Sequence, residues 1–442
     1  MSLFIVGLDN TIVNVALPSI RRDLDASVSQ LQWTIDAYTL VLASLLMLSG
    51  STADRLGRVR VFQVGLAVFT LGSLACTVAP SVGWLIAFRM VQAVGGSMLN
   101  PVAMSIIRNT FDDPRERAQA IGIWGAVIGV SMALGPVLGG ALVELSWRAI
   151  FLVNLPVGLL AIALTARYVP ESRAPRARRV DPVGQVLVVV LLSTLVYGII
   201  ESAPLFYAIA AGALVALLAY EPRRREPLIE LRFFRSAPFS GATLVAISAF
   251  AALAGFLFMN TLYLQDVRGY SPIHAGLLTL PMAAVTVFGA PLSGRIVGSY
   301  GARGPLLLGG AGITVSALML TNLGPHTSLW WLGAAYAVFG IGFGVVNPPI
   351  TNTAVSGMPP SQAGVAAAVA STSRMIGQSL GVAVVGATLH GALPGTGSET
   401  GWWIVTACGV VVFVLGLATT TQWAKRTADE TARRLDEPAV AA

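Results

Sequence analysis

The chain has 442 residues, of which 55% are hydrophobic and only 11% are charged, and it carries a net charge of +7. A soluble globular protein has about 25% charged residues, so this composition excludes a soluble domain. It predicts an all-α polytopic membrane protein, because helices satisfy their own backbone polar groups in lipid.

Apolar runs long enough to cross about 30 Å of hydrocarbon recur along the chain. They lie near residues 3–20, 33–51, 61–79, 83–105, 118–142, 147–168, 182–199, 205–221, 238–264, 273–297, 304–321, 328–354, 362–386 and 400–421. The pattern predicts about fourteen spanning helices. An even number returns both termini to the same side of the membrane.

The positive charge is distributed unevenly among the loops. Most of the 28 basic residues lie in alternate loops and in the C-terminal tail, and the intervening loops carry only Arg21, Arg22, Arg148 and Arg268. This asymmetry follows the positive-inside rule and indicates topology rather than nucleic-acid binding. We expect a multi-pass protein of the inner (cytoplasmic) membrane with both termini in the cytoplasm.

The first two apolar runs each contain a carboxylate. Asp9 inside a spanning helix costs about 3 kcal/mol, so it should face a cavity or a partner, and Asn14 is close enough along a helix to share that polar region. The alternative is that Asp9 lies at a shortened helix start near water. Asp36 begins the second run near the outer face. It is either a functional carboxylate or one that is simply solvated at the interface.

A tight basic turn joins the second and third runs and holds Gly50, Asp54, Arg55, Gly57 and Arg58. Its spacing resembles the loop between helices 2 and 3 of the major facilitator superfamily, Gly-x-x-x-Asp-Arg-x-Gly-Arg-Arg, although Val59 departs from the second basic position. In that family the loop helps gate the cytoplasmic side. The alternative is a basic turn that only sets topology.

The fourth run carries Arg89, followed one turn later by Gln92. An arginine within the membrane needs water or a counter-ion. The pair resembles the family's Arg-x-x-Gln-Gly motif, whose arginine is implicated in proton coupling, although Gly95 follows two residues late. Arg89 would stabilise ionised Asp9 or Asp36 until a proton or a cationic substrate relieves the pairing. Both acids remain open as its partner.

The fifth run is rich in small residues around one proline: Gly125, Gly129, Gly135, Pro136, Gly139 and Gly140. Small residues let helices approach closely, and Gly-Pro weakens the backbone ladder. The run resembles the antiporter motif Gly-Pro-x-x-Gly-Gly, with Ser131 at a position usually held by glycine. Static packing is the alternative. The first run, from Leu8 to Pro18, resembles the signature of the fourteen-span QacA/EmrB-like drug:proton antiporters.

Two arginine-rich loops bracket the seventh and eighth runs and leave six runs on each side. We therefore expect an N-terminal six-helix half (1–168), an inserted helix pair with basic flanking loops (169–237), a C-terminal six-helix half (238–421) and a polar cytoplasmic tail (422–442). Ser49, Gly50 and Gly57 correspond to Ser293, Gly294 and Gly301 at a constant offset of 244, as expected for a repeat. Gly298 stands where the second half would need an aspartate.

The second half contributes polar residues in its last runs, namely Asn347, Arg374 and Gln378. With Asn14 and Gln92 they are candidates for lining a substrate cavity. We find no acid in the apolar interior of this half, so the partner of Arg374 is a backbone carbonyl, water or an acid of the first half. The alternative is packing with an arginine that reaches toward the interface.

Other chemistries find no support in the sequence. There is no P-loop, the three histidines are scattered, and nothing indicates a metal, a cofactor or an enzyme. The resemblance implies a major facilitator fold that exports hydrophobic or amphiphilic drugs in exchange for protons, working as a monomer in the lipid bilayer. A narrow exporter of one metabolite or self-made antibiotic is the alternative, and a non-transporting receptor or enzyme is a remote one.

Overall fold

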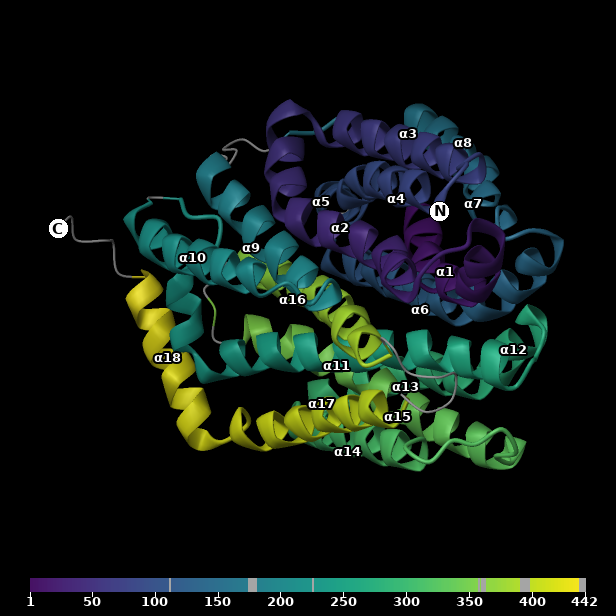
Figure 1. Cartoon of the computed structure of the whole chain (residues 1–442). Helices are drawn as coiled ribbons and strands as arrows, with labels where there is room; N and C mark the ends of the chain where they lie inside the picture. The colour runs from purple at the N-terminus through teal and green to yellow at the C-terminus, as the bar shows by residue number, and fades with distance from the viewer. Residues whose placement is uncertain are drawn as a thin grey trace.

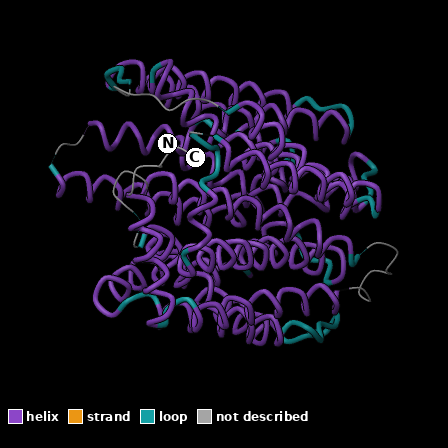
Figure 2. The backbone as a smooth tube through the Cα atoms, turned by 90° about the vertical axis from the view of Figure 1, so that its left-hand side faces the viewer, coloured by secondary structure: helices purple, strands orange, loops and turns teal. Residues whose placement is uncertain are grey.

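The computed structural model describes residues 1–110, 113–173, 181–224, 226–356, 358, 363–389 and 398–436, and these residues form helices without a strand. Figure 2 shows the helices with their loops at the helix ends. The expectation of an all-helical protein is confirmed for this part of the chain.

The first group of helices is α1 (Ser2–Leu24), α2 (Val28–Leu56), α3 (Arg58–Thr77), α4 (Val82–Ser97), α5 (Leu99–Thr110), α6 (Pro114–Leu145), α7 (Ala149–Leu152) and α8 (Asn154–Tyr168). Next come α9 (Pro182–Ile200), α10 (Pro204–Tyr220) and the 3-10 turns η1 (Glu221–Arg223) and η2 (Leu231–Arg235).

The last group is α11 (Ala237–Leu262), the π-helical turn η3 (Tyr263–Val267), α12 (Pro272–Leu278), α13 (Leu280–Tyr300), α14 (Arg303–Met319), α15 (Leu329–Val355), α16 (Ala363–Ala387), α17 (Ser398–Ala418) and α18 (Gln422–Asp436). Each predicted apolar run overlaps one of these helices or two consecutive ones. Within the described residues, ten helical stretches are long and apolar enough to cross a membrane. The count of fourteen stays a prediction.

The helices pack in a pattern that occurs twice. In the upper part of Figure 1, α1 packs on α6, α2 on α4 and α3 on α8; in the lower part, α11 packs on α16, α13 on α15 and α14 on α17. These pairs have the same order along the chain, which favours two related halves. The proposed domain boundaries stay a prediction, and parts of the basic loops lie outside the described residues.

Matching turns follow α2 in the first group and α13 in the last group. Gly57 (φ 116°) lies between α2 and α3, and Gly301 (φ 84°) lies between α13 and α14, so both turns use left-handed backbone that suits glycine. Ser49 in α2 and Ser293 in α13, which precede Gly57 and Gly301 by the same number of residues, are both buried. Ser49 Oγ lies 2.9 Å from Ser97 Oγ, and Ser293 Oγ donates to the carbonyl of Val345 at 2.6 Å.

Contacts between the two groups include several bonds near the ends of α1, α11 and α16 and the start of α2. Gln32 Nε2 donates to the carbonyls of Val382 (3.2 Å) and Ala383 (3.0 Å). Gln265 Nε2 donates to the carbonyl of Val15 at 2.9 Å. An ion pair between Arg21 and Asp266 (3.6 Å) adds to them. These bonds close one end of the interface between the groups.

The C-terminal tail contains a helix that the sequence analysis did not predict. In α18 the small side chains of Ala424, Ala428 and Thr431 are buried, and the helix packs against α11 and η2. The hydroxyl of Thr427 accepts a hydrogen bond from the N–H of Ala237 at 3.0 Å. Its polar composition hid this helix, because only one narrow face of small residues is apolar.

Helices α3 and α4 cross with their backbones in contact. A Cβ atom built on Gly95 would lie 2.6 Å from the carbonyl oxygen of Gly65 and 2.8 Å from the Cα of Phe69. One turn further along α3, a Cβ on Gly72 would lie 2.7 Å from the backbone nitrogen of Gln92. Small residues at such crossings are what permits tight packing in membranes.

We therefore expect Gly95→Ala to destabilise the protein. Overpacking of this kind costs about 1–3 kcal/mol, which should lower the thermal unfolding temperature in detergent by several degrees. Gly212→Ala in α10 is the control, because a Cβ there meets nothing within 4 Å. Equal unfolding temperatures for the two variants would contradict close backbone contact between α3 and α4 at Gly95.

Candidate functional site

A buried ion pair joins α1 and α4. Arg89 Nη1 lies 2.5 Å from Asp9 Oδ2, and the two side chains are 2% and 0% exposed. Gln92 donates from Nε2 to Asp9 Oδ1 at 2.9 Å and accepts from Arg89 Nη1 at 2.7 Å. Three residues that the sequence singled out thus form one cluster, and Asp9 rather than Asp36 is the acid that pairs with Arg89.

Further polar groups complete this cluster, and the sequence analysis missed them. Ser73 of α3 accepts from Gln92 Nε2 at 2.8 Å, and Asn154 of α8 approaches both Asp9 (3.4 Å) and Ser73 (3.3 Å). Asn154 is a polar residue inside an apolar run, a signal that could have identified it. Ser73 carries no such signal because serine is common in packed helices.

Helix α2 covers the arginine from another side. Arg89 Nε donates to the carbonyl of Thr34 at 3.2 Å, and its guanidinium carbon lies 4.1 Å from the centre of the Tyr38 ring. Removing one partner of a buried pair leaves an uncompensated charge and costs about 3–5 kcal/mol. The cluster of Asp9, Ser73, Arg89, Gln92 and Asn154, here called the polar cluster, is therefore sensitive to any single loss.

Asp36 lies in α2 outside the polar cluster and is fully buried. Its carboxylate oxygens have no hydrogen-bond partner within the described residues, and the hydroxyls of Thr39 and Ser379 are its polar neighbours. The alternative of a carboxylate solvated at the outer face is therefore wrong for this conformation, because α2 begins well before residue 33 and α16 covers the site.

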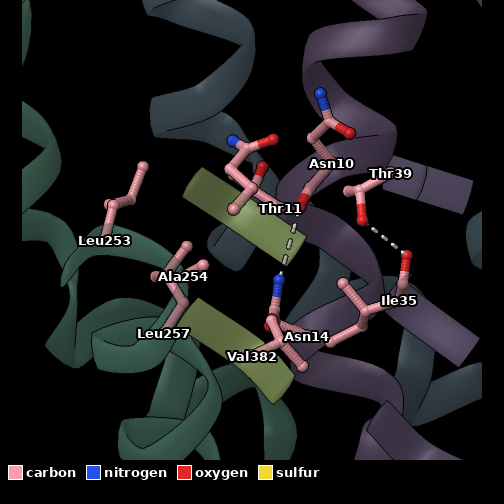
Figure 3. A pocket seen from close by; sticks show the side chains of 10 residues that line it. Asn10, Thr11, Asn14, Ile35, Thr39, Leu253, Ala254, Leu257 and Val382 are labelled. Atoms are coloured by element: carbon pink, nitrogen blue, oxygen red, sulfur yellow. Dashed lines mark hydrogen bonds between the residues drawn. The ribbon is translucent and has the colours of Figure 1, made fainter. Parts of the chain in front are cut away.

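A small cavity lies where α1, α2, α11 and α16 meet (Figure 3), with a volume of about 20 Å³. Helix α1 contributes the polar side chains of Asn10, Thr11 and Asn14, α11 contributes only apolar ones, and α2 and α16 contribute both kinds. Its lining consists of Asn10, Thr11, Asn14, Ile35, Thr39, Leu253, Ala254, Leu257, Gln378 and Val382. The space has room for about one water molecule, so a drug-sized ligand requires these helices to move apart.

Two of the five predicted cavity residues line this space. Asn14 lines it together with a neighbouring cavity of about 10 Å³, and Gln378 lines the first. Gln92 belongs to the polar cluster instead. Asn347 in α15 and Arg374 in α16 line neither of these two cavities and are half-buried.

The basic turn after α2 is stabilised by an ion pair between its own residues and by hydrogen bonds to a residue outside it. Asp54 pairs with Arg58 at 2.9 Å, and Gly50 faces Pro101 of α5. Arg55 is exposed. From outside, the carboxylate of Glu171 accepts hydrogen bonds from the N–H groups of Val59 (3.0 Å) and Arg60 (3.1 Å) at the start of α3.

Glu171 lies just after α8 and was not identified from the sequence. Burial raises the pKa of its carboxyl, but hydrogen bonds from backbone N–H groups at Val59, Ser172 and Arg60, together with the charge of Arg60, hold the pKa below its ordinary value of 4.5. The ionised form therefore caps α3, where the helix dipole also favours a negative charge. Gly57 has no room for a side chain beside this carboxylate, since its Cβ would lie 2.8 Å from it.

The glycine-rich run lies in α6, where this helix passes between α1 and α12. Gly135 and Gly139 face Thr11 and Ile12 of α1, and Gly140 faces the backbone of Pro272 and Ile273. The carbonyl of Pro136 faces Gly276 of α12. Gly125 and Gly129 lie in the same helix, and their surroundings lie outside the described residues. The motif thus forms the contact between α6 and its two neighbours.

Comparison with known proteins identifies the family. Residues 1–382 match the Major Facilitator Superfamily profile. The chain belongs to this superfamily. It is 37% identical over 406 residues to the multidrug resistance protein Stp of Mycobacterium tuberculosis, covering 90% of this chain and 75% of that protein. It is 36% identical over 397 residues to the methylenomycin A resistance protein of Streptomyces coelicolor, covering 87% and 82% respectively.

The fold comparison agrees. The structure matches an inward-facing bacterial homologue of the human lysosomal transporter Spinster with a TM-score of 0.68 at 19% identity, covering 98% of this chain and 96% of that one. The chain is accordingly a multi-pass membrane transporter and not an enzyme. Its resemblance to the major facilitator superfamily is confirmed, whereas membership of the fourteen-span antiporter group stays a prediction.

The Glu171 cap makes a specific prediction for the turn. Glu171→Gln removes the negative charge, so the amides of Val59 and Arg60 should exchange with deuterium about threefold to tenfold faster. Glu144→Gln, which changes an exposed carboxyl in α6, should leave them unchanged.

The same experiment has a pH dependence with a defined sign. Because folding lowers the pKa of Glu171, its contribution is present above pH 4.5 and is lost as pH falls through the folded pKa. In the wild type, the protection of the Val59 and Arg60 amides from deuterium exchange, corrected for the intrinsic exchange rate, should therefore fall only below pH 4.5. Protection that is equal in the variant and the wild type at pH 7 would show that Glu171 does not hold the turn.

Proposed function

We propose that this protein exports hydrophobic or amphiphilic drug-like compounds in exchange for protons, by alternating access across the inner (cytoplasmic) membrane. The relatives named for multidrug and methylenomycin A resistance support export of such compounds. The observation that carries proton coupling is the buried pair of Asp9 and Arg89, a titratable group held beside the interface between the two groups of helices.

One helix links the proton site to the cavity. Asp9 points into the polar cluster, whereas its neighbours Asn10, Thr11 and Asn14 line the cavity between the groups (Figure 3). A proton on Asp9 neutralises the partner of Arg89, which then relies on Gln92 Oε1 and the Thr34 carbonyl, both already within 3.2 Å. The resulting shift of α1 changes the cavity lining, so protonation and substrate binding affect the same element.

Alternating access requires that the two ends of the interface between the groups of helices open and close alternately. The bonds from Gln32 and Gln265 close one end of the interface, and the turn from Gly50 to Arg58 lies at the other end of α2. The positive-inside rule places that turn in the cytoplasm. Movement of α1 and α2 against α11 and α16 would open a drug-sized site from the present small cavity.

Fourteen spans, arranged as two six-helix halves with α9 and α10 inserted, are part of this proposal. The twice-occurring helix pairs and the matching glycine turns support it. Both termini then lie in the cytoplasm, and one chain contains the complete pathway, so the monomer suffices.

A second candidate is a narrow exporter of one antibiotic. The similarity to a methylenomycin A resistance protein favours it, and the mechanism would be the same. Transport of a panel of chemically unrelated compounds separates the two, because a narrow exporter moves one member and a multidrug exporter moves several.

Dye efflux from energised cells tests the proposal. We expect wild-type efflux to stop with a protonophore, and Arg89→Ala and Asp9→Asn at matched expression to lower it at least tenfold, because each leaves the polar cluster without one charge. Asp36→Asn tests the second buried acid in parallel. Glu144→Gln is the control on the protein surface.

The outcomes separate the roles of these groups. Efflux that persists unchanged in the Asp9 and Arg89 variants would make the polar cluster structural. Loss in Asp36→Asn alone would move proton coupling to α2. Wild-type efflux that ignores the protonophore would overturn the proton-coupled mechanism.

A further inference from the structure

A second arginine lies within the helical bundle, and its surroundings differ from those of Arg89. Arg374 is in α16 one turn before Gln378, which lines the cavity. Phe250 of α11, whose ring centre is 5.9 Å from the guanidinium carbon, is one turn before Leu253 and Ala254 of the same cavity lining. Arg374 and Phe250 therefore lie next to the cavity, on the side toward the starts of α11 and α16.

The partners of Arg374 are all neutral. Nη1 lies 3.4 Å from Ser371 Oγ, and Nη2 donates to the hydroxyl of Thr351. Its Nε is buried and has no hydrogen-bond partner among the residues that the structure describes. In the described part of the chain no carboxylate forms an ion pair with it. Asp36 faces Ser379, further along α16, and is not paired with Arg374.

The positive charge of Arg374 is therefore not compensated by a carboxylate among the described residues. Arg89 has the carboxylate of Asp9, whereas within the described residues the contacts of Arg374 are hydroxyls and an aromatic ring. Arg374 is half-buried, and burying a charge without a counter-ion is costly. A guanidinium with free N–H groups binds a carboxylate strongly, and often through two parallel hydrogen bonds. A bound anion would therefore satisfy Nε and compensate the charge together.

We propose that Arg374 binds the anionic group, a carboxylate or a phenolate, of an exported organic compound. This inference rests on the proposed export function and names a substrate class for it. The site would pair the anion with Arg374 and Thr351 while the apolar body lies along Leu253, Ala254 and Leu257 of α11.

The other side chains that line the cavity indicate which groups the rest of such a ligand would carry. The side-chain oxygens of Asn10, Asn14 and Gln378 are buried and have no hydrogen-bond partner in the described ranges of the chain, so they are positioned to accept hydrogen bonds from hydroxyl groups. Phe250 packs edge-to-face on Phe343, with ring centres 5.2 Å apart, and these rings stiffen the wall beside Arg374. The geometry suits a hydroxylated, mainly apolar organic acid rather than a simple inorganic anion.

The test compares two dyes that share a ring system but differ in charge. Fluorescein carries a carboxylate and a phenolate, and rhodamine 6G is a cation with an esterified carboxyl. Binding of each to the purified full chain is measured by fluorescence polarisation in vesicles of phosphatidylcholine and phosphatidylethanolamine, which supply no anionic headgroup. Repeating the measurement with phosphatidylglycerol added shows whether an anionic lipid competes for the same arginine.

We expect Arg374→Gln to weaken fluorescein binding at least tenfold and to change rhodamine 6G binding less than twofold. Arg374→Lys should recover part of the fluorescein affinity, because it restores the charge without the planar fork. Arg426→Gln removes one exposed positive charge from α18 and should change neither dye. Retained rhodamine 6G binding by the Gln variant also shows that the variant is folded.

Several outcomes would overturn the proposal. These are equal loss of both dyes in Arg374→Gln, no loss of fluorescein, or a wild-type protein that does not bind fluorescein. Loss of fluorescein binding only in vesicles with phosphatidylglycerol would assign the site to the lipid headgroup and overturn it as well. Selective fluorescein binding without any export, in contrast, would support the anion site and contradict the proposed function.

Discussion

The attraction between Arg89 and Asp9 in a water-poor interior constrains how the first group of helices packs. An isolated charge in this environment is costly, so the arginine, the carboxylate and the amide of Gln92 must meet within hydrogen-bond distance. Five helices converge to supply the groups. The glycines of α3 and α4 permit that convergence, since side chains at the crossing would hold Ser73 away from Gln92.

The two arginines of the helical bundle therefore differ: Arg89 is buried and Arg374 is half-buried. Arg89 is neutralised by Asp9 within the first group of helices and holds α1 and α4 together. Arg374 is surrounded by hydroxyls and an aromatic ring, so its charge remains available. Helix α1 lies between the polar cluster and the cavity, with Asp9 on one face and Asn10, Thr11 and Asn14 on another. In the proposed mechanism this one rigid helix would link the two sites directly, without a long chain of contacts.

The sequence predicted an all-helical protein with many apolar helices because length and apolarity are local properties, and ten helical stretches among the described residues are long and apolar enough to cross a membrane. It also identified Asp9, Arg89 and Gln92, since polar groups stand out in apolar runs. It left the partner of Arg89 open between Asp9 and Asp36, because neighbouring helices cannot be assigned from one sequence. Glu171 was missed because its role depends on a contact more than 100 residues away. Helix α18 was missed because its composition is strongly polar, although its buried residues Ala424, Ala428 and Thr431 recur at helical spacing.

The bonds from Gln32 and Gln265 end on backbone carbonyls of Val382, Ala383 and Val15, not on side chains. A carbonyl persists whatever residue carries it, so mutation at the accepting positions leaves the acceptor in place. Natural variation can therefore reshape the apolar surface of α16 or α1, and with it the fit to new compounds, while the closure remains intact. These bonds therefore depend on the side chains of Gln32 and Gln265 alone, and changes that compensate for the loss of either glutamine must arise at positions other than Val382, Ala383 and Val15.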